Sequence, residues 1–93
     1  MTCTDSNTAT TAIFQAIESA ISLREVSRIS HHWDEEFSVS ILALSNEVTC
    51  EVVYDPDFGH YTCQFTYTNG DTLVEMEHFD KQFCNVVASQ YKF

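Results

Sequence analysis

Residues 48–77 read VTCEVVYDPDFGHYTCQFTYTNGDTLVEME, and this stretch decides the fold. Apolar and polar side chains alternate along it with a period of two, which is typical of strands with one buried face. Asn69-Gly70 is a strong signal for a tight hairpin turn, and the segment from Asp55 to Phe58 carries a proline suited to a turn. The stretch therefore predicts three strands joined by two hairpins.

The same alternation predicts a further strand before this stretch. Phe37, Val39 and Ile41 alternate with polar and apolar neighbours, and Ser45-Asn46 reads as a two-residue turn. A slip of one residue in any hairpin would turn a whole strand over, so the expected register can be tested by its facing pairs. These apolar pairs are Val39–Val52, Ile41–Cys50, Val52–Tyr61, Cys50–Cys63, Phe65–Val74 and Cys63–Met76. The sequence predicts a four-stranded antiparallel meander.

Helical spacing flanks the predicted strands on both sides. From Thr8 to about Arg28, isoleucines recur four residues apart, which indicates an amphipathic helix. Asp80 is suited to cap a second helix that continues to the C-terminus. We therefore expect an α+β two-layer sandwich with the order αββββα and both helices on one sheet face. Residues 1–7 are expected to form a flexible tail, and residues 8–93 a single domain.

Charge is the most unusual property of the composition. The chain has 14 acidic residues against four basic ones, for a net charge of −10 over 93 residues. Such a protein repels nucleic acid and anionic membranes and associates quickly with basic surfaces. No apolar run reaches the ~18–20 residues of a membrane span, and no export signal is visible at the start. We expect a cytoplasmic protein that binds neither nucleic acid nor membrane directly.

The expected register leaves one sheet face rich in carboxylates. Acidic side chains at such positions are also ordinary for a solvated face, and this is the plain alternative to a binding surface. The candidate partner-binding residues are Glu47, Glu51, Glu75 and Glu77 on the face, Asp55 and Asp57 in the proline turn, Asp34, Glu35 and Glu36 before the first strand, and an apolar corner of Leu42, Leu44 and Leu73.

Residues that could carry chemistry are present but poorly arranged for it. The four cysteines, Cys3, Cys50, Cys63 and Cys84, match no zinc spacing, and we expect free thiols, although Cys50 and Cys63 face each other closely enough for a bridge. The run His31-His32 and the Asp55 to His60 segment hold metal-ligand types but read as connectors. No phosphate loop or nucleophile elbow occurs. We expect no catalytic residue, cofactor or metal.

These observations favour a small acidic protein-binding module over an enzyme. Its sharpest form is an inhibitor that occupies a basic, nucleic-acid-binding surface of a partner. Phage and mobile-element proteins that block CRISPR or restriction complexes are often of this size and charge, and this analogy is general, without a shared motif. The alternatives are a non-inhibitory adaptor or homodimeric structural subunit, and then a small enzyme or metal-binding protein. The sequence leaves monomer and homodimer open.

Overall fold

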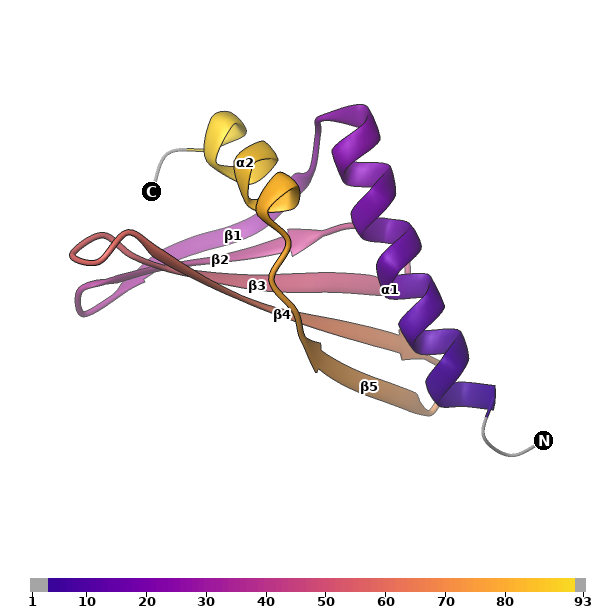
Figure 1. The fold of residues 1–93 in the computed structure, drawn as a ribbon. Coiled ribbons are helices and arrows are strands. Elements are labelled where there is room, and N and C mark those ends of the chain that lie inside the picture. Colours follow the sequence, from indigo (N-terminus) through magenta and orange to yellow (C-terminus); the bar gives the residue numbers. More distant parts are fainter. Residues whose placement is uncertain (1–3, 92–93) are drawn as a thin grey trace.

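The computed structural model describes residues 4–91, and the side chains of residues 7–91. The elements are α1 (Thr4–Leu23), β1 (Ser27–Asp34), β2 (Phe37–Ala43), β3 (Val48–Asp55), β4 (His60–Asn69), β5 (Thr72–Glu77) and α2 (Lys81–Gln90). The strands form one antiparallel sheet in the order β1-β2-β3-β4-β5 (Figure 1). The α+β class and the antiparallel meander are confirmed, with five strands in place of the predicted four.

The additional strand, β1, follows an early end of the first helix. Arg24 adopts a φ of 55°, a left-handed conformation that stops α1 directly after Leu23. The expected helix end near Arg28 was therefore wrong, and α1 also begins earlier than expected, at Thr4. The pairing of β1 with β2 shifts between Arg28 and Ser30. This bulge interrupts the alternation of side chains, which hid the strand from the sequence pattern.

Two hairpins are displaced by two residues from the expected register. Asp55 faces His60 across a four-residue loop that ends at Gly59, where φ is 63°. The next turn lies at Gly70-Asp71, one residue later than expected. A displacement of two residues keeps every side chain on its predicted face. The predicted facing pairs were wrong, however, and the observed ones are Cys50–Phe65, Val52–Cys63, Tyr54–Tyr61, Phe65–Met76 and Tyr67–Val74.

Strand β2 is turned over relative to the prediction. The connection to β3 is a three-residue loop, closed by the Leu44 N–H donating to the Val48 carbonyl at 2.9 Å and by the Val48 N–H donating to Ser45 Oγ at 3.1 Å. The odd loop length places Leu42 opposite Cys50. Leu42 is fully buried and Leu44 packs against the core, so the expected exposed leucine corner was wrong for both.

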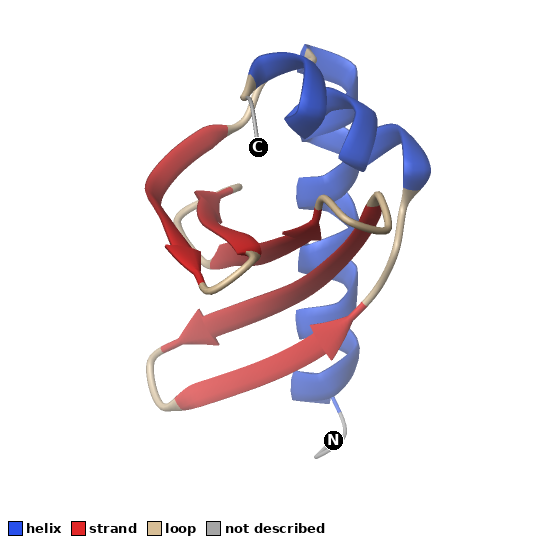
Figure 2. Cartoon of the chain, turned by 90° about the vertical axis from the view of Figure 1, so that its left-hand side faces the viewer, coloured by secondary structure: helices blue, strands red, loops and turns tan. Residues whose placement is uncertain are grey.

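The core joins both helices to alternate residues of the sheet. Ile13 and Ile17 of α1 and Phe83 of α2 belong to the same buried cluster as Cys50 and Phe65, and the rings of Phe65 and Phe83 lie 5.5 Å apart. Figure 2 shows α1 crossing the strands at a steep angle. The cluster therefore occupies the sheet face that carries the even-numbered residues of β2 and β3 and the odd-numbered residues of β4.

Helix α2 is held at both ends. The Asp80 carboxylate accepts a hydrogen bond from the Phe83 N–H at 2.9 Å, as expected of an N-cap. At the other end, the Tyr91 hydroxyl donates to the Val26 carbonyl at 2.6 Å and accepts from the Arg28 N–H at 3.0 Å. The Arg28 guanidinium lies 4.3 Å from the centre of the Tyr91 ring. These contacts fasten α2 to the start of β1.

Candidate functional site

The sheet face opposite the core, called here the open face, carries the candidate residues Glu51, Glu75, Glu77 and Leu73. Its middle row runs through Ser30, Ile41, Glu51, Gln64 and Glu77, which are consecutive partners across the five strands. A parallel row reads Ser27, Ala43, Thr49, Thr66 and Glu75. The three glutamates are exposed. Sheet register therefore places three carboxylates on one surface although they come from two separate strands.

The other candidate acids lie at the ends of the strands. Asp34 ends β1, and Glu35 and Glu36 form the turn to β2, where all three are exposed. The Asp55 carboxylate accepts the Asp57 N–H at 3.0 Å, so it is engaged in shaping its own turn. Glu47 lies in the β2–β3 loop and accepts a hydrogen bond from the Asn69 amide at 2.8 Å. These residues do not share the rows of Glu51 and Glu77.

The turned-over strand changes the apolar part of the open face. Phe37, Val39 and Ile41 lie there, beside Val53 of β3, which faces Val39. Phe37 is 39% exposed, Ile41 and Val53 are half-buried, and Val39 is buried between its neighbours. Sequence reasoning missed this apolar strip because it assigned these side chains to the core. Leu73 stands on the same face, 61% exposed, opposite Thr68 of β4.

The arginines and the lysine that the structure describes lie away from the open face. Arg24 lies in the connection between α1 and β1, and Lys81 begins α2. Arg28 faces Leu42, on the core side of the sheet, and stacks on Tyr91. Of the arginines and lysines within residues 4–91, none therefore lies on the open face beside its glutamates.

The buried thiols form the tightest cluster of reactive atoms. Cys50, Cys63 and Cys84 are free and buried, and the sulfur atoms of Cys63 and Cys84 lie 3.8 Å apart. The hydrogen bond between Cys63 and Cys50, together with burial, raises the pKa of Cys63 to about 12. The hydrogen bond to Cys63 and burial also raise the pKa of Cys84. Both thiols stay protonated at neutral pH and make poor nucleophiles or metal ligands. Cys3 lies outside the described residues.

A cleft opens at the edge of the sheet where β5 ends. It has a volume of about 510 Å³ and is lined by His60, Tyr61, Thr62, Cys63, Glu77, His78 and Phe79. The lining residue His78 is held by two contacts: its ring lies edge-on to that of Phe14, with 4.9 Å between centroids, and its backbone N–H donates to the Cys63 carbonyl at 3.2 Å. Of these residues only Glu77 is among the predicted partner-binding residues, whereas His60 and Cys63 had been considered for chemistry and set aside.

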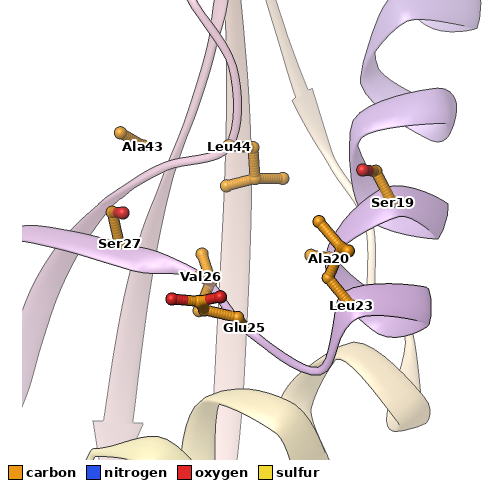
Figure 3. Close-up of a pocket in the computed structure, with 8 residues that line it drawn as sticks. All are labelled: Ser19, Ala20, Leu23, Glu25, Val26, Ser27, Ala43 and Leu44. Atoms are coloured by element: carbon orange, nitrogen blue, oxygen red, sulfur yellow. The ribbon is translucent and has the colours of Figure 1, made fainter.

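A second hollow, of about 290 Å³, lies where α1 ends and β1 begins (Figure 3). Glu25 is the one charged side chain among the described residues that line it, beside Leu23, Val26 and Leu44. Across residues 7–91, no three histidine, cysteine or acidic side chains converge as metal ligands would. His31 instead bonds the Ser38 hydroxyl through Nε2 at 2.8 Å.

Neither α1 nor α2, as far as the described residues extend, has both the length and the apolar character required to cross a membrane. Comparison of the chain with protein-family models, with curated proteins and with solved structures finds no match.

Proposed function

We propose that the protein is a binding module for a basic protein surface, and that it docks through the open face. The observation that carries the proposal is the composition of that face. Exposed Glu51 is the strand partner of Ile41 in the apolar strip, whereas exposed Glu75 and Glu77 lie on the same face two strands further on, in β5. The arginines and lysines described by the structure lie elsewhere. Carboxylates around an apolar centre are the usual composition of a protein interface with a charged rim.

The proposed mechanism has two stages. The net charge of −10 draws a basic partner towards the protein and raises the association rate. The apolar strip then supplies contacts that lose water on docking, with Phe37 as the most exposed of the strip residues on β2. In its sharpest form, the proposal makes the protein an inhibitor that places carboxylates where a partner would hold phosphates, as anti-CRISPR or anti-restriction proteins do.

The proposal includes the two-layer arrangement expected from the sequence. Both helices are taken to cover one face of the sheet, so that the other face stays available to a partner. The shared core cluster of α1, α2 and the sheet supports this arrangement. So does the exposure of the glutamates on the other side of β3 and β5.

The test is capture of basic proteins on the immobilised protein, followed by elution with salt and, separately, with duplex DNA. We expect retained nucleic-acid-binding proteins to elute in both cases. Salt should release them because exposed charges are screened beyond ~8 Å at physiological ionic strength. Duplex DNA should release them because its phosphates compete for the same basic surface. The triple variant Glu51→Lys, Glu75→Lys and Glu77→Lys should abolish capture.

A matched control reverses Glu18, Glu25 and Asp71, which are exposed but lie outside the rows of the open face. Three reversals of two units each take the net charge from −10 to −4 in both variants. Equal loss of capture in the two variants would show that only the net field matters and would refute docking through the open face.

A further inference from the structure

We propose that the cleft at the end of β5 receives an arginine side chain of the basic partner. This inference rests on the proposed function, because it names the chemistry by which one residue of that partner is recognised. The cleft arises because β4 begins at His60 whereas the last pair between β4 and β5 is Gln64–Glu77. The chain then turns away through His78 and Phe79 towards α2, and the edge of β4 is left beside a hollow.

The volume and walls of this cleft suit one long side chain. Its volume of about 510 Å³ falls within the ~300–1,000 Å³ of ordinary ligand pockets. Phe79 stands at the rim with 58% of its surface exposed, and Tyr61 is half-buried against the ring of Tyr54, at 4.6 Å between centroids. Such aromatic faces attract a flat cation and cover the methylene groups that carry it.

The charges around the cleft select a cation. The Glu77 carboxylate is exposed and lines it directly. Asp55 is the strand partner of His60, and Asp80 follows Phe79 as the cap of α2. Asp55, Asp80 and Lys81 all lie outside the lining of the cleft, and Lys81 is the one cation among these neighbours. Negative charge therefore exceeds positive charge at this edge of the sheet.

Arginine fits these features better than lysine. Its guanidinium group is planar, so it can lie on an aromatic ring while its edge binds a carboxylate through two N–H groups. A lysine ammonium is more strongly hydrated and presents no flat surface for stacking. Because Glu77 also belongs to the middle row of the open face, an arginine in the cleft would anchor the margin of the larger interface.

The probe for this inference is the peptide acetyl-Gly-Arg-Gly-amide, with the lysine and norleucine peptides as references. Amide and imidazole resonances of the labelled protein report where each peptide binds. We expect the arginine peptide to shift resonances of residues 60–63 and 77–79, the lysine peptide to bind more weakly, and the norleucine peptide to leave them unmoved.

Two carboxylates of β5 provide a matched comparison. Glu77→Gln and Glu75→Gln remove the same charge from exposed positions two residues apart, but only Glu77 lines the cleft. Glu77→Gln should weaken the arginine peptide about tenfold, the usual effect of losing a charge-assisted hydrogen bond, and Glu75→Gln should change its affinity little. Phe79→Ala should also weaken it. Equal weakening by the two glutamate variants, or arginine and lysine binding alike, would overturn the inference.

Failure of this inference can be told apart from failure of the proposed function. The double variant Glu51→Lys and Glu75→Lys reverses the charge of two glutamates of the open face and leaves the residues that line the cleft unchanged. If the peptide fails to shift the cleft resonances and the double variant still loses capture of basic proteins, the cleft inference is wrong and the proposed function stands. If the peptide binds in the cleft and capture is unchanged, docking through the open face is wrong.

Discussion

Replacing two buried serines of β2 by alanine should change the free energy of unfolding in opposite directions. Ser38 and Ser40 lie on the core side of the sheet, two residues apart, and both are 0% exposed. The Ser38 hydroxyl is hydrogen-bonded to His31 Nε2 at 2.8 Å. The Ser40 hydroxyl is buried with no hydrogen-bond partner in the described part of the chain. We therefore expect Ser40→Ala to stabilise the protein and Ser38→Ala to destabilise it.

The magnitudes follow from the balance of hydrogen bonding and desolvation. A buried polar group left without a partner costs about 1–3 kcal/mol, whereas a satisfied hydrogen bond contributes about 1 kcal/mol net. Removing one oxygen atom at Ser40 leaves a void that offsets part of the gain. We expect Ser40→Ala to raise the free energy of unfolding by about 1 kcal/mol, and Ser38→Ala to lower it by about 1 kcal/mol.

Urea unfolding followed by circular dichroism measures both effects. With a slope of about 1 kcal/mol per molar urea for a small domain, the two midpoints should differ by about 2 M and should lie on either side of the parent protein. The thermal midpoints should move in the same directions, by about 4–8 °C each. Destabilisation of similar size in both variants would refute the reasoning, since it would mean that the Ser40 hydroxyl is satisfied in solution.

Three further predictions concern the core and its thiols. Ile17→Ala should lower the free energy of unfolding by about 2–4 kcal/mol through cavity formation, whereas Leu73→Ala, at a position 61% exposed, should change it by less than about 0.5 kcal/mol; similar losses in the two variants by urea unfolding would contradict the assigned core. Cys63 and Cys84 should react with a thiol reagent only on unfolding, and a non-reducing mass showing the loss of two hydrogens would instead reveal a bridge. Folding raises the pKa of Cys63 from its ordinary value of 9.0 to about 12. The contribution of the protonated Cys63 thiol to stability should therefore be fully present below pH 9 and lost as the pH rises through about 12. A urea midpoint that falls as much in Cys63→Ala as in the parent protein over pH 9–11 would show that the fall does not come from Cys63.

The sequence predicts correctly which strand side chains face the core wherever the error in register is an even number of residues. The turns at Gly59 and Gly70 lie later than the expected ones, but each displaces the pairing by an even number of residues. Glu51 and Glu77 therefore remain on the side away from the core despite the wrong partners. In strand β2 the error was one residue, so the predicted faces were exchanged. Apolar side chains occupy both faces of this strand, and alternation alone cannot choose between them.

The sequence by itself determined the α+β class, the antiparallel meander, the cap of α2 by Asp80, and the excess of negative charge, because period, cap chemistry and charge are local or summed properties of residues. Only the tertiary structure decided that Leu42 lies in the core and Ile41 on the open face, through a three-residue loop whose odd length no composition reveals. It also decided that a bulged strand, β1, completes the sheet, and that β5 ends before β4 is covered. The cleft exists for that last reason, since it depends on where two strands end relative to each other in space.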